Sequence, residues 1–199
     1  MPIVYSKLSS GPVVEPISIT EAKLDLKIDD STEDDLLAIL IKASRETVEI
    51  RTGRSLITQT RVIKMDYFPC TDTIKIPNGP VQSITHVKYY DEDEVLQTLD
   101  SSEYWVDSDS DICRVVVKDS WPSTEDRPNA VIVTYVCGYG TAGSSVPAPL
   151  RKAMLFILGH LYENRQNVIV SGSSTGVLEI PMGAEYLMSN YILEQEVYY

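Results

Sequence analysis

The sequence predicts an α+β fold, in which a helical bundle of N-terminal and C-terminal helices carries an inserted antiparallel β-module. Three observations predict it: capping signals and helical periodicity over residues 16–55, strand-like alternation over residues 56–137, and helical periodicity again over residues 146–165. Residues 166–199 follow as a flexible Gly/Ser-rich loop and a terminal segment. A length of 199 residues suits one domain with a sizeable insertion.

The first helix is expected within residues 16–28. Ser18 and Glu21 have the spacing of a capping box, in which each side chain accepts a hydrogen bond from the other residue's backbone N–H. Ala22, Leu24 and Leu26 continue the helix, which therefore begins at about Ser18.

The second helix is expected to open at Ser31, with Asp34 as its capping partner, and to end at Gly53. Its expected apolar stripe comprises Leu36, Ile39, Leu40 and Ala43. The pairs expected on its outer side, at i,i+4 spacing, are Lys42–Glu46 and Arg45–Glu49. The pattern predicts a long amphipathic helix.

The β-module is expected to contain seven short strands, separated by turn signals such as Asn78-Gly79 and the acidic run 91–94. The expected strands are Ile57–Asp66, Thr73–Ile76, Ser83–Tyr90, Val95–Leu99, Tyr104–Val106, Ile112–Lys118 and Ala130–Val136. Strands of this length at hairpin spacing indicate a small antiparallel sandwich or barrel.

The helix expected from Pro147 to about Asn164 is apolar nearly all round. One face comprises Leu150, Ala153, Met154, Ile157 and Leu161. Leu155, Phe156 and Tyr162 occupy another side, so we expect this helix to be buried on two sides, in its own bundle and against a neighbouring subunit. A short terminal helix is expected over residues 181–191, after the Gly/Ser loop 171–176.

Composition and charge exclude several classes of protein. The longest strongly apolar stretch, residues 153–161, is far shorter than the roughly 20 residues that a bilayer span needs, so we expect no membrane association. Residues 1–10 contain one lysine and no apolar run of a secretory signal, so we expect assembly in a cytoplasm. The net charge of −12 disfavours tight binding of nucleic acid, because phosphate affinity comes from Lys and Arg.

The cysteines and aromatic residues also bear on function. Three cysteines without a CxxC spacing indicate reduced, mostly buried side chains and neither a disulfide framework nor a zinc site. Among the aromatic residues, 12 are Tyr and only 2 are Phe. Because Tyr combines an apolar ring with a polar tip, this composition favours an interaction protein.

Two motifs resemble ligand sites and fail on their spacing. Gly138, Gly140 and Gly143 match GxGxxG, but Pro147 opens the next helix too late for a dinucleotide site, and no second strand of a βαβ unit follows. The run Asp107, Asp109 and Asp111 starts like a calcium loop, but Ile112 and Lys118 replace the required Gly and Glu.

No pattern of residues indicates catalysis. The two histidines, His86 and His160, have no recognisable zinc or triad partners, and no P-loop, HExxH or nucleophile elbow occurs. We therefore expect no catalytic residues, no cofactor, no metal and no enzymatic activity.

Three stretches carry a family resemblance: PISITEAKLDLKIDDSTEDDLLAILIKASRETVEIRTGRSLITQT (16–60), SWPSTEDRPNAVIVTYVCGYG (120–140) and VPAPLRKAMLFILGHLYENR (146–165). Together and in this order they resemble the head–tail connector (adaptor) proteins of long-tailed bacteriophages and gene transfer agents. Arg54 after Gly53, and the helix end from Gly159-His160 to Asn164-Arg165, are the most specific features of the resemblance.

The resemblance implies a structural virion protein of the neck between capsid and tail, assembled in the host cytoplasm. Such proteins form a homo-oligomeric ring, commonly of twelve copies, beneath the portal protein. The ring extends the channel used in DNA packaging and offers an attachment surface for the stopper or tail-completion protein, and genomic DNA passes through without specific binding. An acidic lining fits this role, because it repels DNA and lets it slide.

Candidate residues follow for both contacts. The subunit-interface candidates are Leu155, Phe156, Tyr162 and Arg54. Because C-terminal segments of the family tend to reach the portal, residues 177–199 become the candidate docking arm. Its portal-docking candidates are Tyr186, Tyr191, Tyr198 and Tyr199.

Two alternatives remain open at this point. In the first, the β-module binds a carbohydrate or peptide on a helical scaffold, with Tyr104, Trp105 and Trp121 at the mouth of the site, although these residues are more simply core residues. In the second, GxGxxG belongs to a nicotinamide enzyme, which its cofactor would stabilise against heat.

Overall fold

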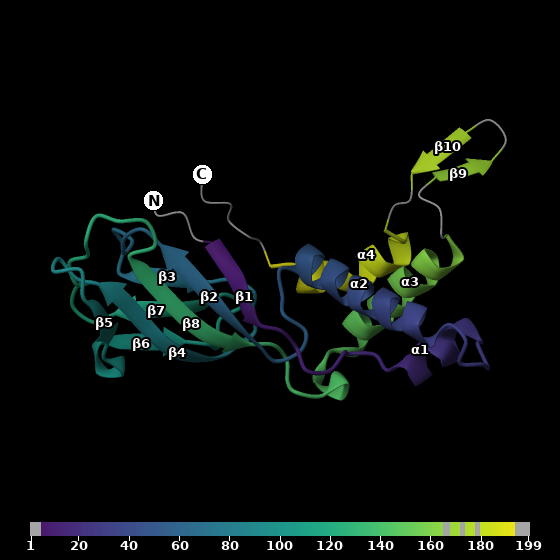
Figure 1. The fold of residues 1–199 in the computed structure, drawn as a ribbon, viewed down its shortest axis with the longest axis horizontal. Helices are drawn as coiled ribbons and strands as arrows, with labels where there is room; N and C mark the ends of the chain where they lie inside the picture. Colours follow the sequence, from purple (N-terminus) through teal and green to yellow (C-terminus); the bar gives the residue numbers. More distant parts are fainter. Residues whose placement is uncertain (1–4, 165–167, 172–173, 178–179, 194–199) are drawn as a thin grey trace. The chain divides into compact units, whose positions relative to one another are not determined.

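A computed structural model describes residues 5–164, 168–171, 174–177 and 180–193 of the chain (Figure 1). The helices are α1 (Ile19–Leu26), α2 (Asp34–Thr52), α3 (Ala148–Glu163) and α4 (Met182–Met188). The strands are β1 (Tyr5–Ser10), β2 (Gln59–Met65), β3 (Thr73–Ile76), β4 (Val81–Tyr90), β5 (Leu96–Leu99), β6 (Tyr104–Asp107), β7 (Cys113–Val117), β8 (Val131–Cys137), β9 (Val168–Ser171) and β10 (Ser174–Val177). The fold is α+β, as the sequence predicts.

The chain divides into two compact units. The β-unit comprises the described parts of Met1–Val13, Gly53–Tyr139 and Leu193–Tyr199. The helical unit comprises the described parts of Val14–Thr52 and Gly140–Ile192. The helical unit thus includes α4, which the sequence analysis assigned to a C-terminal arm.

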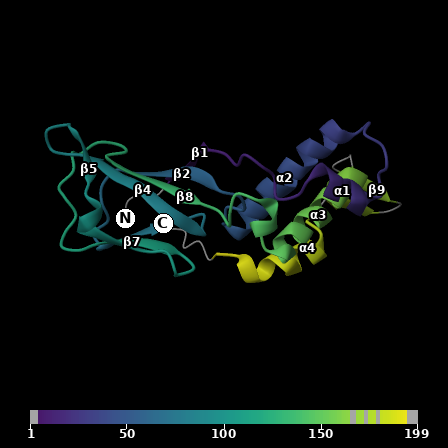
Figure 2. The same cartoon turned by 90° about the horizontal axis from the view of Figure 1, so that it is seen from below.

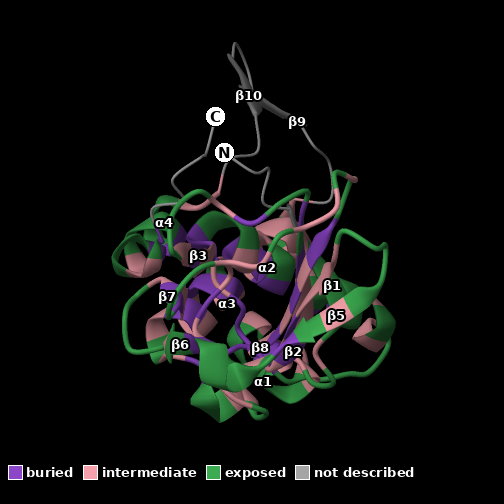
Figure 3. Ribbon diagram, turned by 90° about the vertical axis from the view of Figure 1, so that its left-hand side faces the viewer, coloured by how far each residue is buried: buried purple, intermediate pink, exposed green. Residues whose placement is uncertain are grey.

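Two antiparallel sheets build the β-unit. One has the strand order β1-β2-β8-β4-β5 and the other has the order β3-β7-β6. The central strand β8 pairs along its whole length with β2, from Val131 opposite Met65 to Cys137 opposite Gln59, and it pairs with β4 on its other side. The edge strand β5 is mostly exposed or half-buried (Figure 3).

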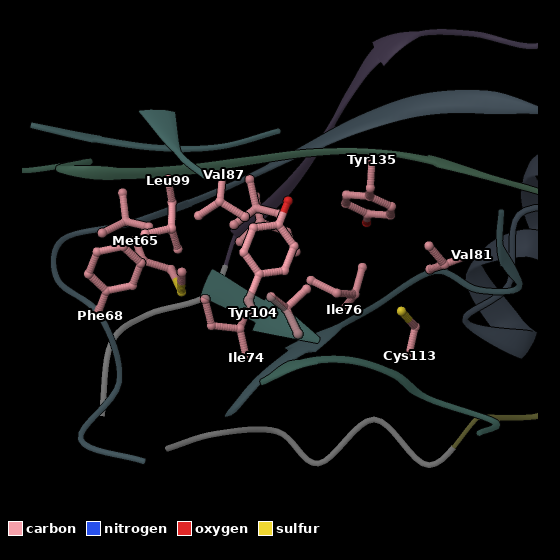
Figure 4. Packing of buried hydrophobic residues seen from close by; sticks show 14 of the residues in the cluster. Met65, Phe68, Ile74, Ile76, Val81, Val87, Leu99, Tyr104, Cys113 and Tyr135 are labelled. Atoms are coloured by element: carbon pink, nitrogen blue, oxygen red, sulfur yellow. The ribbon is translucent and has the colours of Figure 1, made fainter. Parts of the chain in front are cut away.

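The core of the β-unit lies between these two sheets (Figure 4). Strict alternation along β8 turns Val131, Val133, Tyr135 and Cys137 inward, because successive side chains of a strand point to opposite faces. From the other sheet, Ile74, Ile76 and Val115 complete the cluster. The β-unit is therefore a small sandwich, one of the two architectures that the strand pattern predicts.

All seven predicted strands of the β-module are present, with ends shifted by one or two residues. The pattern analysis missed β1, and it treated residues 171–176 as a loop, although β9 and β10 pair as an antiparallel hairpin there. Short strands without alternating apolar residues carry little signal in a sequence.

The start of the helical unit follows the capping signals. Ser18 is the N-cap of α1, and its hydroxyl accepts from the backbone N–H of Glu21 at 3.1 Å. In turn, Oε2 of Glu21 accepts from the backbone N–H of Ser18 at 2.9 Å. The hydrogen bond from the backbone N–H of Ser18, followed by the bond from its hydroxyl and by the charge of Arg151, lowers the pKa of the Glu21 carboxyl. The predicted capping box is confirmed.

The predicted apolar stripe of α2 is wrong. The buried residues of this helix are Leu37, Ile41, Ser44, Arg45, Val48 and Thr52. Leu36, Leu40 and Ala43 are only half-buried, and Ile39 is exposed. Arg45, predicted on the outer side, is 4% exposed. The reason is that the buried face contains polar residues with partners inside the unit, which a search for apolar residues alone passes over.

The other helices complete the unit. Helix α3 packs against α1, α2 and α4, and α2 and α4 contact it from two sides (Figure 2). Its buried face comprises Leu150, Ala153, Met154, Ile157 and Leu158. Gly53, with φ of 67°, ends α2 as predicted. Within the described residues, no helix is long and apolar enough to cross a bilayer.

Candidate functional site

Phe156 lies on the outer side of α3 and is 40% exposed. The Nζ of Lys152, one turn earlier, is 4.8 Å from the centroid of its ring, and it also bonds to Oδ1 of Asp25 at 2.7 Å. A methyl group added to Gly183 of α4 would lie 3.3 Å from Cε2 of Phe156. The edge of the Phe156 ring therefore packs against the backbone of the first turn of α4.

Two further apolar side chains extend this surface. Met182 and Tyr186, four residues apart on α4, lie on the same side of the helix and are 86% and 80% exposed. The opposite side of α4 buries Ala184 and Met188. We call Phe156, Met182 and Tyr186 the α4 patch. It joins one subunit-interface candidate and one portal-docking candidate in a single surface.

Helix α2 carries a second, partly exposed apolar surface, and the sequence analysis predicted four of its residues, Leu36, Ile39, Leu40 and Ala43, as the buried stripe of this helix. We call it the α2 stripe, and its residues are Leu36, Ile39, Leu40, Ala43, Thr47 and Ile50. Ile39 is 66% exposed and Ile50 is 82% exposed. The hydroxyl of Thr47 donates to the carbonyl of Ala43 at 2.8 Å, so the polar atom of this side chain is satisfied within the helix. In the sequence, the apolar residues of α2 form two sets that lie on different faces of the helix, and this pattern was the available sign of a second apolar surface.

The remaining α3 candidates are less exposed. Leu155 and Tyr162 are half-buried. The phenol of Tyr162 donates to Oε2 of Glu33, which precedes α2. Tyr162 therefore holds the start of α2 against the end of α3, and its contribution to a subunit interface stays a prediction, as does that of Leu155.

Arg54 belongs to the β-unit, whereas the other three interface candidates belong to the helical unit. Its side chain is 12% exposed, and Nη2 lies 3.3 Å from Oδ1 of Asp111. Its backbone forms an isolated parallel bridge with Asn78. These contacts give Arg54 a role in holding two loops of the β-unit together, and a role at an interface stays a prediction.

The docking candidates are only partly described. Tyr191 ends the short 3₁₀ turn after α4 and is half-buried. Tyr198 and Tyr199 lie outside the described residues.

The GxGxxG glycines serve close packing. An added Cβ would lie 2.4 Å from the carbonyl oxygen of Ile57 at Gly138, and 2.5 Å from that of Pro16 at Gly143. The preceding strand β8 pairs antiparallel with both of its neighbours, whereas a dinucleotide site requires a parallel βαβ unit. The geometry therefore matches the sequence argument against a dinucleotide site.

The acidic loop after β6 is organised by its own side chains. Asp107 accepts from Nε of Arg114 at 3.1 Å and from Oγ of Ser110 at 2.8 Å. The bonds from Arg114 and then Ser110 lower the pKa of Asp107 to about 2. Asp111 pairs with Arg54 instead. Across the described part of the chain, no group of three His, Cys, Asp or Glu residues is arranged to hold a metal ion.

The three aromatic residues of the ligand-binding alternative do not form one surface. Tyr104 is buried in the sandwich core. Trp121 stacks on Phe68 with ring centroids 4.7 Å apart, and its Nε1 donates to the carbonyl of Thr71 at 2.8 Å. Trp105 is 58% exposed on the outer face of β6, beneath Lys118. Adjacent residues of a strand face opposite ways, so Tyr104 and Trp105 cannot line one mouth.

Residues 16–110, which include α1, α2 and the five strands β2 to β6, match the family described as phage gp6-like head-tail connector protein. The resemblance to the head–tail connector proteins is thereby confirmed over this segment. The family is one of structural virion proteins, so the expectation of a structural connector and not an enzyme is confirmed. No curated protein matches the sequence.

Three solved structures share the fold of this connector. The neck of an empty GTA particle, computed with C6 symmetry, contains a chain with a TM-score of 0.78 and 17% identity, over 94% of this chain and 95% of that chain. A chain in the virion of the native gene transfer agent (GTA) particle has a TM-score of 0.77 and 18% sequence identity, over 94% of each chain. A chain in the neck of the native GTA particle, computed with C12 symmetry, has a TM-score of 0.71 and 18% sequence identity, over 94% of each chain. The likeness in fold thus extends beyond the family-matched segment.

Proposed function

We propose that this connector forms a closed ring of twelve identical subunits in the neck of a phage-like particle, beneath the portal protein. The observation that carries the proposal is the shared fold with chains of GTA necks, over 94% of this chain. Twelvefold symmetry includes sixfold symmetry, so one ring of twelve satisfies reconstructions of both kinds.

The charge of the chain supports passage of DNA through such a ring. Each chain carries a net charge of −12, and the first 100 and the last 99 residues contribute −6 each. A lumen lined by such subunits repels phosphates and offers few cations for counterion release. Genomic DNA then slides through the ring without specific binding.

The partners of the ring are the portal protein on one side and a stopper or tail-completion protein on the other. Residues 177–199 are the candidate portal-docking arm. Within their described part, Tyr186 is exposed and Tyr191 is half-buried. Tyrosines suit such a contact because they bury apolar area while their hydroxyls stay hydrated.

The test is native mass spectrometry and electron microscopy of the purified chain, alone and mixed with its portal protein. We expect rings of about twelve times the 22.2 kDa mass of one chain, or a collar of twelve copies on the portal. A collar without free rings would show that the portal templates assembly. A monomer or dimer that is indifferent to the portal would overturn the proposal.

A further inference from the structure

The outer face of the five-stranded sheet of the β-unit carries lysines in register. Lys64 of β2 lies opposite Ile132 of β8, and Lys88 of β4 lies opposite Ile132 on the other side. In the neighbouring row, Lys7 of β1 lies opposite Val62 of β2. Directly opposite residues share a face of the sheet, and Val62 and Lys64 are two residues apart, so all five side chains lie on one face. We call these five residues the lysine face.

The lysine face points away from the core. Lys64, Ile132 and Lys88 each follow a residue of the core cluster in their strands. These preceding residues are Ile63, Val131 and Val87. Because successive side chains of a strand point to opposite faces, the row is turned outward. Lys7 and Lys64 are exposed, whereas Val62, Ile132 and Lys88 are half-buried, so the face presents ammonium groups beside a small apolar centre.

The lysines of this face have no anionic partner in their own subunit. Among the residues that the structure describes, Lys7, Lys64 and Lys88 form no ion pair. The backbones of Lys64 and Lys88 are two strands, or about 10 Å, apart. Burial first, and then the charge of Lys88, lowers the pKa of the nearby His86. The positive charge on this face is therefore uncompensated within the described chain.

A second copy of the chain, with its net charge of −12, supplies the complementary charge. Five acidic residues lie within residues 29–35, which lead into α2. Three of them, Asp29, Asp30 and Asp35, are exposed and form no ion pair in the described part of the subunit. Ile39, which is 66% exposed, follows Asp35 by one turn on the same side of α2. We call Asp29, Asp30, Asp35 and Ile39 the α2 corner.

Another acidic run, residues 91–94 in the β4–β5 turn, suits the lysine face less well. Asp91 accepts from the backbone N–H of Val95 at 2.9 Å and from the side chain of Gln97 at 2.6 Å, so its carboxylate already serves the turn. The α2 corner instead combines carboxylates outside any ion pair with an exposed apolar side chain on a long helix.

We propose that the lysine face of one subunit binds the α2 corner of the next subunit. The lysine face belongs to the β-unit and the α2 corner to the helical unit, so the contact joins two unlike surfaces. A closed ring of more than two identical subunits requires such a contact. This inference rests on the proposed ring and names the faces that close it. Lysines engaged in this way are not available to DNA phosphates, which suits a channel through which DNA slides.

Charge reversal tests the contact in the full chain. Lys7→Glu/Lys64→Glu reverses the lysine face, and Asp29→Lys/Asp35→Lys reverses the α2 corner. All four side chains are exposed, so both variants should keep the circular dichroism and the melting temperature of the wild type. Each variant alone should lose the rings and be a monomer in native mass spectrometry, because like charges then face one another across the contact.

The two variants should rescue each other. An equimolar mixture should form rings in which they alternate in equal numbers, because each reversed surface then meets its opposite. A chain with all four substitutions, which has the net charge of the wild type, should also form rings. Lys42→Glu/Lys118→Glu, at two exposed lysines outside both surfaces, is the control for added negative charge and should assemble like the wild type. If the wild type assembles only on the portal, the same comparison applies to collars on the portal.

Three results would overturn the contact. The first is rings of either reversed variant alone, and the second is a mixture and a four-substitution chain that both stay monomeric. The third is rescue of Lys7→Glu/Lys64→Glu by Glu92→Lys/Glu94→Lys in place of the α2 corner variant. Binding of a DNA duplex by the wild type that is lost in a Lys7→Glu/Lys64→Glu chain that still forms rings would assign the lysine face to nucleic acid instead.

The same samples separate this inference from the proposed function. Closed rings of the wild type, together with closed rings of each reversed variant, would support the ring and overturn the contact. Open filaments of the wild type that are lost in each reversed variant and restored in the mixture would support the contact and overturn the closed ring.

Discussion

Nε of Arg45 donates to Oε2 of Glu15 at 2.8 Å and so fastens the segment before α1 to the middle of α2. The Arg45 side chain is 5% exposed, and its Nη1 also donates to Oε2 of Glu49 at 2.8 Å. Burial would lower the pKa of Arg45, but the charges and hydrogen bonds of Glu49 and Glu15 outweigh it and raise this pKa. A buried arginine thus organises acidic residues from two segments of the helical unit.

Replacement of Arg45 with alanine should therefore destabilise the chain strongly. Removing one member of a buried ion pair leaves carboxylates without compensation and costs about 3 kcal/mol in the free energy of unfolding. Arg45→Lys should cost less, because the charge remains while the planar fork of donors is lost. Urea unfolding followed by circular dichroism measures both.

Arg51→Ala is the matched control for Arg45→Ala. Arg51 lies on the same helix and bonds to Oε1 of Glu185 at 2.7 Å, but its side chain is 52% exposed. Exposed ion pairs contribute less than about 1 kcal/mol. Equal losses in the two variants would contradict the structural importance assigned to Arg45.

Tyr135→Phe should destabilise the β-unit by about 1–2 kcal/mol. The ring is fully buried in the core (Figure 4). Its hydroxyl donates to the carbonyl of Pro77 at 3.0 Å and lies 3.1 Å from Oγ of Ser6. Burial is the first cause that raises the pKa of this phenol, so it stays protonated as a donor. Tyr67→Phe, at a 44% exposed ring, should change the unfolding midpoint in urea little; the same loss at both positions would refute the argument.

Local signals in the sequence predicted most of the secondary structure. The Ser18–Glu21 capping box and Gly53 act within one turn of helix, so their spacing alone defines the helix ends. The strands of the β-module alternate because one face of each sheet meets a single core. Strand β1 carries no such signal, since most of its described side chains are exposed at the edge of a sheet.

The surfaces could not be predicted in the same way, because they depend on tertiary partners. Arg45 is buried, and one of its ion-pair partners, Glu15, lies 30 residues earlier in the chain, where helical spacing gives no sign of the contact. The face of α2 that is buried together with Arg45 carries Leu37 and Ile41, and Ile39 on another face is therefore exposed. The exposure of Phe156 was anticipated from an α3 that is apolar all round, but its contact with Gly183 depends on how α4 packs.

Gly138→Ala should cost about 2–3 kcal/mol in the free energy of unfolding. The residue has φ of 121°, and its added Cβ would lie 2.4 Å from a backbone oxygen that cannot turn aside. Gly11→Ala is the control, because its Cβ would meet only a leucine methyl at 3.7 Å. Thermal unfolding of both variants measures the difference. A Gly138→Ala chain as stable as Gly11→Ala would show that the backbone at the end of β8 is not constrained.

Asp107→Asn should lower the melting temperature at neutral pH and lose this effect in acid. The pKa of Asp107 is about 2 in the folded chain, below its ordinary value of 3.8, so its ionised form favours the folded state. That contribution is complete above the ordinary pKa and disappears as the pH falls toward 2. Melting temperatures of wild type and variant should therefore converge between pH 4 and pH 2. Asp109→Asn, in the same loop, controls for the loss of one charge, and a gap that persists for Asp107→Asn at pH 2 would contradict the role of the Arg114 and Ser110 bonds.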